Sequence, residues 1–114
     1  MEILIFEIKG KTYEVKDLRV GKFIDLWKMR TALSMGTYGQ MYRTALESSD
    51  QALLAIDIEA FFSVFCPDMI NDLKPGSIRD LGVIDYLELR DIYEIHIKPW
   101  LDKVEKLMGK KEDE

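Results

Sequence analysis

The sequence predicts an α+β domain that is mainly α-helical, and three observations support this. Apolar and polar residues alternate over positions 2–16, around a glycine that suits a tight turn. From position 20 onward, apolar residues recur at the spacing of three or four that is typical of helices. Prolines and glycines divide this helical region into segments. We therefore expect an N-terminal β-hairpin followed by a bundle of about four helices, the last of them kinked at Pro99.

The hairpin is expected within residues 2–16. Its inward face consists of Leu4, Phe6, Ile8, Tyr13 and Val15. The apolar Ile3 and Ile5 lie on the opposite face, and Gly10 allows the positive φ of a tight turn. Because a two-stranded hairpin is marginal by itself, its apolar surfaces must pack on helices or pair with another chain.

The first helix is expected from about residue 20 to residue 34, with Asp17 as its capping residue. Its apolar stripe comprises Phe23, Leu26, Trp27, Arg30 and Leu33. Gly36 and Gly39 end this helix before a short helical stretch over about residues 40–46.

A second long helix is expected to be capped by Ser48, Ser49 or Asp50 and to end at Pro67. Its apolar face comprises Leu54, Ile58, Phe61, Phe62 and Phe65. The stripes of the two long helices predict that four aromatic side chains are largely buried, namely Trp27, Phe61, Phe62 and Phe65.

Two prolines shape the rest of the helical region, which we expect over residues 20–108. Pro67 can begin one further helical turn, because the first amide of a helix has no partner. From Val83 the last helix is expected to run to about Met108. Pro99 removes a backbone hydrogen bond within it and should kink or split it, leaving residues 100–108 as a semi-independent arm.

The length of 114 residues suits one domain that buries roughly two-thirds of its unfolded surface. We expect a single domain over residues 1–108 and a charged, flexible tail over residues 109–114. All apolar runs are shorter than the roughly 20 residues of a membrane span, and the first residues do not resemble a signal peptide. The expected location is therefore the cytoplasm, with no membrane partner.

The charge is unevenly distributed along the chain. The net charge of −5 combines +2 over residues 1–33, +1 at Arg43, and −8 over residues 44–97, where eleven acidic residues accompany three basic ones. Residues 98–114 are neutral overall. A region this acidic repels a phosphate backbone, which argues against nucleic-acid binding. The carboxylates either form solvated helix faces or attract a basic protein partner, and both interpretations stay open.

The sequence contains no recognisable catalytic constellation. His96 is the only histidine, and no second ligand or carboxylate shares its helical face. Cys66 is the only cysteine and is expected to be a small buried side chain. Phosphate-binding, nucleotide-binding and zinc-binding spacings do not occur. We therefore expect a protein without enzymatic activity, metal or cofactor, which acts through its surfaces.

The N-terminal segment resembles a known family. An apolar strand, Gly-Lys and Tyr-Glu-Val-Lys lead into Leu-Arg-Val-Gly-Lys-Phe at the start of the helical region. This order resembles the small tail assembly chaperones of tailed phages, best over residues 3–30, and the acidic helical remainder is similar in type. The resemblance implies a transient, non-enzymatic helper in the host cytoplasm. Such a helper binds the long helical tape measure protein and recruits tail tube subunits.

Partner binding is expected at two apolar surfaces. One is the outer face of the hairpin at Ile3 and Ile5, where an open strand edge also favours a homo-oligomer. The other is the arm beyond Pro99, unless the arm packs back on the hairpin as core, and this alternative stays open. The apolar stripe of the arm comprises Trp100, Leu101, Val104, Leu107 and Met108.

Two further function classes stay open. The same hairpin could add a strand to a neighbour in a permanent virion component, such as a tail or connector protein. The acidic middle of the chain could instead belong to a small inhibitor or an antitoxin-like protein that masks a basic site.

Overall fold

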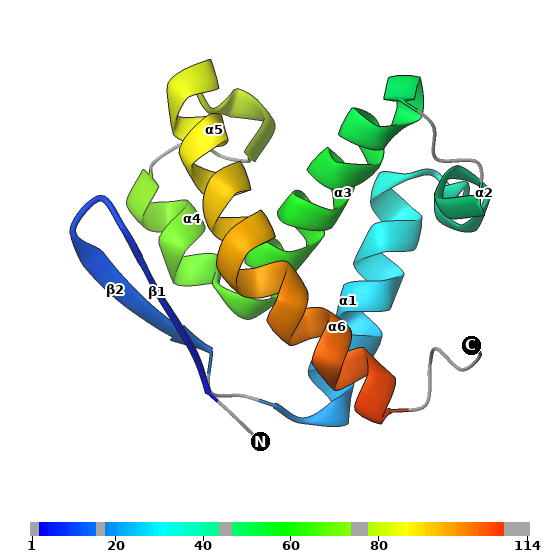
Figure 1. The fold of residues 1–114 in the computed structure, drawn as a ribbon, viewed down its shortest axis with the longest axis horizontal. Helices are drawn as coiled ribbons and strands as arrows, with labels where there is room; N and C mark the ends of the chain where they lie inside the picture. Colours follow the sequence, from blue (N-terminus) through cyan, green and yellow to red (C-terminus); the bar gives the residue numbers. More distant parts are fainter. Residues whose placement is uncertain (1–2, 16–17, 44–46, 74–77, 109–114) are drawn as a thin grey trace. The chain divides into compact units, whose positions relative to one another are not determined.

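The computed structural model describes residues 3–15, 18–43, 47–73 and 78–108. It confirms the predicted class, because an N-terminal antiparallel hairpin is followed by helices (Figure 1). The hairpin and the first four helices are β1 (Leu4–Ile8), β2 (Lys11–Val15), α1 (Val20–Leu33), α2 (Tyr38–Arg43), α3 (Glu47–Phe65) and α4 (Pro67–Leu73). The remaining elements are a 3₁₀ turn η1 (Ile78–Asp80), α5 (Val83–Ile92), a π-helical turn η2 (Tyr93–Ile97) and α6 (Lys98–Leu107).

The contacts of the chain fall into two compact units. One unit joins Met1–Glu14 to Gly82–Glu114, and the other is Val15–Leu81. The first therefore contains the hairpin, except for Val15 at the end of β2, with α5, η2 and α6, and the second contains Val15 and α1 to α4 with η1. The single domain expected over residues 1–108 stays a prediction, and the tail predicted over residues 109–114 lies outside the described residues.

In the first unit, the hairpin has the two faces that its sequence pattern predicts. The side chains of Leu4, Phe6, Ile8 and Val15 are buried, and β1 packs on α5. Tyr13 is half-buried, and its ring stacks on that of Phe6 with the centroids 5.9 Å apart. Strict alternation along β1 therefore separates a packed face from an exposed one.

The hairpin turn has two residues with left-handed backbone, Lys9 at φ 52° and Gly10 at φ 80°. Positive φ at both central residues is the geometry whose twist matches a two-residue hairpin, and glycine adopts it without steric cost. The ammonium of Lys9 lies 2.7 Å from a carboxylate oxygen of Asp85 in the first turn of α5. The hydrogen bond and the charge of Asp85 raise the pKa of Lys9, and the contact connects the turn to α5.

The helical backbone continues from α5 through Pro99 by means of the π-helical turn η2. The amide of Lys98 donates a hydrogen bond to the carbonyl of Tyr93, five residues earlier. We attribute this wide turn to Pro99, which has no amide hydrogen and whose ring crowds the preceding turn of an α-helix. The helix is therefore divided into segments at this position, and a bend of its axis stays a prediction.

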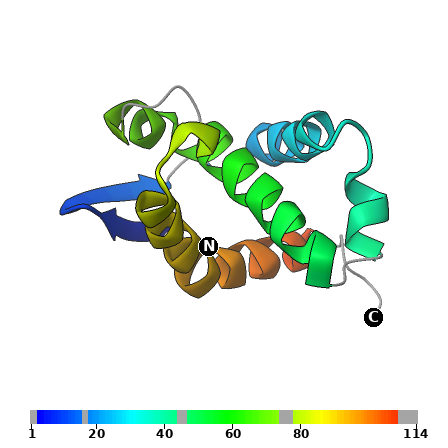
Figure 2. The ribbon, with the colours of Figure 1, turned by 90° about the horizontal axis from the view of Figure 1, so that it is seen from above.

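The second unit has an aromatic core, where α1 packs against α3 (Figure 2). The rings of Phe61 and Phe65 stack at 5.0 Å, and Phe23 and Phe62 approach this pair edge-on at 5.2 Å from Phe65 and 5.5 Å from Phe61. Phe61 and Phe62 are fully buried, as the helical spacing predicts. Contacts between aromatic rings stabilise a fold by more than the burial of their apolar surface alone.

Two of the four aromatic side chains expected in the core are less deeply buried than the other two. Trp27 flanks the line of buried residues on α1, which runs through Phe23, Leu26 and Arg30. Phe65 is the last residue of α3. All four side chains are therefore largely buried, and a stripe drawn from spacing alone does not predict which of them lie at its centre and which at its margins.

The C-terminus of α1 is closed by a Schellman motif. The amide of Gly36 donates to the carbonyl of Thr31 at 2.8 Å, and the amide of Met35 donates to that of Ala32 at 3.1 Å. Met35 has φ 56° at the position after the cap, where glycine is the usual residue. The sequence therefore places the glycine one residue later than the standard motif does.

Several expected helix boundaries are corrected by the structure. Gly39 lies within α2 and does not break the chain, so the short helix begins at Tyr38 and not near residue 40. Because α3 begins at Glu47, the residues proposed as its cap, Ser48, Ser49 and Asp50, lie inside the helix. Asp17 lies outside the described residues, and the residue before α1, Arg19, makes no capping hydrogen bond through its side chain.

Candidate partner-binding surface

The outer hairpin face consists of Ile3, Ile5 and Glu7, which alternate with the buried residues of β1. The side chains of Ile3 and Ile5 are 53% and 54% exposed, as expected. The sheet has only the two strands β1 and β2 within the described residues, so each strand there has one neighbour. Unpaired strand edges beside exposed isoleucines are the features through which a hairpin pairs with another chain.

Other apolar side chains of the first unit are also exposed to solvent. They belong to the start of α5, to η2 and to the end of α6, and they are Val83, Ile84, Ile95, Leu107 and Met108. Single exposed apolar residues are common on protein surfaces, so these positions do not by themselves indicate a binding site.

The C-terminal arm divides into buried and exposed parts. Trp100, Leu101 and Val104 are buried, whereas Leu107 and Met108 are exposed. Three of the five arm residues that the sequence nominates for partner binding therefore belong to the protein interior. The helical spacing of α6 places these three on one side, and it cannot reveal whether that side faces the same chain or a partner.

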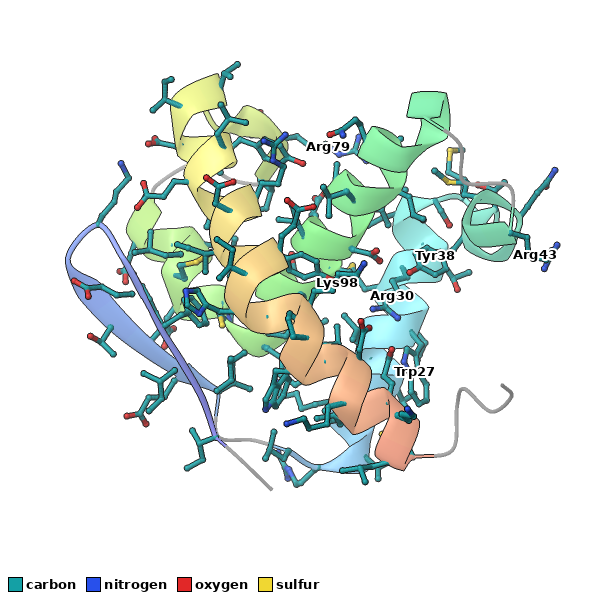
Figure 3. The ribbon with its side chains drawn as sticks, viewed as in Figure 1. Trp27, Arg30, Tyr38, Arg43, Arg79 and Lys98 are labelled. Atoms are coloured by element: carbon teal, nitrogen blue, oxygen red, sulfur yellow. The ribbon has the colours of Figure 1, made fainter. Side chains whose placement is uncertain are left out.

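The second unit contains a buried polar cluster that the sequence analysis does not predict. The guanidinium Nε of Arg30 on α1 lies 3.2 Å from Oδ1 of Asp57 on α3. The hydroxyl of Tyr38 on α2 donates to the same Asp57 oxygen at 2.7 Å. The charged centre of Arg30 also lies 5.3 Å from the centre of the Tyr38 ring, and Figure 3 shows these two side chains next to one another.

This cluster joins three helices through one carboxylate. The side chains of Arg30 and Asp57 are 8% and 16% exposed, so little water screens their attraction. Since Asp57 accepts a hydrogen bond from the Tyr38 hydroxyl and faces the guanidinium, its carboxylate is occupied by internal partners. The chemistry of the cluster is therefore that of a structural ion pair, which positions α2 against α1 and α3.

Cys66 and His96 have opposite environments. Cys66 is buried, and burial, with a smaller contribution from the charge of Asp68, raises the pKa of its thiol from 9.0 to about 12. A thiol that keeps its proton is a poor nucleophile, and the expectation of a buried side chain is confirmed. His96 is exposed in η2.

The described residues outside the hairpin form neither a metal-binding cluster nor a membrane-spanning helix. In the described ranges, His, Cys, Asp and Glu side chains form no group of three or more that could hold a metal ion. None of the described helices combines the length and apolar character needed to cross a membrane. Neither a protein-family model, nor a curated protein, nor a solved structure matches the chain.

Proposed function

We propose that this protein is a non-enzymatic tail assembly chaperone of a tailed phage. It binds the tape measure protein in the host cytoplasm during tail assembly, and the tail tube protein is a second partner. The proposal combines the resemblance over residues 3–30 with one structural observation, which is the exposed outer hairpin face. The same segment carries both, since Ile5 lies in β1 and Ile3 directly precedes it, where the resemblance begins.

The outer hairpin face suits a transient cover for an apolar partner. A helical protein with unburied apolar faces aggregates unless another protein shields those faces. Ile3 and Ile5 supply apolar contact area, and the strand edges supply backbone groups for pairing. The net charge of −5 favours solubility of the complex, because like-charged particles repel one another.

Co-expression with a fragment of the tape measure protein from the same genome tests the proposal. We expect the wild-type chain to keep the fragment soluble, and the double variant Ile3→Lys/Ile5→Lys to lose most of this effect. Met35→Lys is the matched control, because it places lysine at an apolar side chain that is 90% exposed and lies outside the hairpin. Circular dichroism of each purified variant checks that it is folded.

Two results would contradict the proposal. If the fragment precipitates although the folded wild-type chain is present, the protein is not its chaperone. If the folded double variant still keeps the fragment soluble, the outer hairpin face does not bind it. The protein composition of finished phage particles separates a chaperone from a permanent virion component. A chaperone is absent from the particles, whereas a structural protein is present. Light scattering shows whether a second copy occupies the strand edge, in which case Ile5→Lys shifts the protein towards monomer.

A further inference from the structure

A groove runs along α1 in the second unit. It has a volume of about 550 Å³ and is open to solvent. One wall is a line of residues on α1 from Lys22 to Ala32, and the other is the corner where α3 ends and α4 begins. The residues that line it are Lys22, Asp25, Lys28, Met29, Ala32, Ser63, Val64 and Pro67.

The groove is lined by apolar residues, which we call its floor, and by charged residues, which we call its rim. Met29, Ala32, Val64 and Pro67 supply the apolar surface, and the unbranched Met29 side chain can adapt to different shapes. The stretch from residue 22 to residue 32 extends about 15 Å along the helix axis, at 1.5 Å per residue. This length matches about three turns of a second helix lying alongside α1.

The two lysines on the rim have different roles. Lys22 donates a hydrogen bond to the carbonyl of Val64 at 3.2 Å, near the C-terminus of α3, where a positive charge is favoured. Lys28 is exposed and forms no ion pair with any residue in the described part of the chain. With Asp25 the rim has a net positive charge, in a protein whose overall charge is −5.

We propose that this groove binds an amphipathic helix of a protein partner, with its apolar side chains on the floor and a carboxylate paired with Lys28. The charge of the rim opposes that of the rest of the chain, so it attracts an acidic segment and disfavours a basic one. The inference rests on the proposed function only for the class of partner, which is a helical protein. It adds a second contact surface to the outer hairpin face.

Two synthetic peptides test the groove without the tape measure protein. Both are amphipathic helices about 18 residues long with the same leucine and alanine face, and the flanking positions carry glutamate in one and lysine in the other. Fluorescence anisotropy measures their binding to the full chain. We expect the glutamate peptide to bind at least about 5-fold more tightly than the lysine peptide, and a higher salt concentration to reduce this difference.

Variants of the rim and the floor then locate the site. Lys28→Glu should reverse the preference between the two peptides, a result that loss of folding cannot produce. Ala32→Trp should weaken the binding of both peptides by about 5-fold or more, because the indole fills the groove. Lys106→Glu is the matched control, since it makes the same charge change at an exposed lysine on α6 and should keep the preference for the glutamate peptide.

Several outcomes would overturn the inference. These are equal binding of the two peptides, no binding of either, or an effect of Lys106→Glu as large as that of Lys28→Glu. Binding that is lost in Ile3→Lys/Ile5→Lys and kept in Ala32→Trp would assign the peptides to the outer hairpin face instead. The peptide assay and the co-expression assay are independent, so either hypothesis can fail while the other stands.

Discussion

Arg30 on α1 and Asp57 on α3 form an ion pair in the interior of the second unit, with 3.2 Å between Nε and Oδ1. Tyr38 on α2 donates a hydrogen bond to the same carboxylate oxygen. Three helices therefore depend on one buried negative charge, which makes Asp57 the most informative position at which to test the packing of this unit.

Replacing Asp57 with alanine should reduce the free energy of unfolding by about 3 to 5 kcal/mol, because the Arg30 guanidinium stays buried without its counter-charge. Urea denaturation measures the loss. The double variant Arg30→Met/Asp57→Leu should recover most of it, since apolar side chains of similar volume replace both charges. Asp25→Ala, at an exposed carboxylate on α1, should change stability by less than about 0.5 kcal/mol. A loss below about 1 kcal/mol in Asp57→Ala would show that the pair is not buried in solution.

Met35→Gly should stabilise the protein by about 1 kcal/mol. Met35 has the left-handed backbone of the Schellman motif at φ 56°, a conformation that costs about 1 to 2 kcal/mol for residues with a Cβ atom. Its side chain is 90% exposed, so little packing is lost on removal. Met35→Ala keeps the Cβ atom and should leave the midpoint of urea denaturation nearly unchanged. Equal effects of glycine and alanine would contradict the explanation by backbone strain.

Truncating an aromatic side chain should cost more stability at the centre of the aromatic core than at its margin. Phe61→Ala should cost about 3 to 5 kcal/mol, a large fraction of the stability of a domain, because the ring is fully buried against Phe62 and Phe65. Phe65→Ala should cost less, since that side chain is half-buried at the end of α3. Denaturant midpoints with an unchanged slope check both values. A larger loss of stability in Phe65→Ala than in Phe61→Ala would mean that α3 buries a different face in solution.

The Cys66 thiol should react at least about 100-fold more slowly with dithionitrobenzoate at pH 8 than free cysteine does, and normal reactivity should return in urea. The physical cause is burial, which raises its pKa from 9.0 to about 12. Since the folded state holds this proton more tightly than the unfolded state, Cys66 contributes to stability below about pH 9 and the contribution falls as the pH approaches 12. Rapid labelling of the folded protein would contradict this environment.

Reasoning from the sequence succeeded where the signal is local. Alternation over β1 correctly predicts which residues of the hairpin are packed and which are exposed, including Ile3 and Ile5. Pro67 correctly marks the boundary between α3 and α4. The capping residues were less predictable, because Ser48 and its neighbours suit a cap chemically but compete with other start points only one or two residues away.

The class of fold, the order of its elements and the two faces of the hairpin follow from the amino-acid order alone, because strand alternation and helical spacing depend on neighbours within about four residues. Only the tertiary structure decided that Arg30, on an otherwise apolar stripe, meets Asp57, and that Trp100 is in the interior and not on a binding surface. A pair 27 positions apart in the chain forms only when two helices pack in one particular register. The spacing of residues along each helix carries no information about that register.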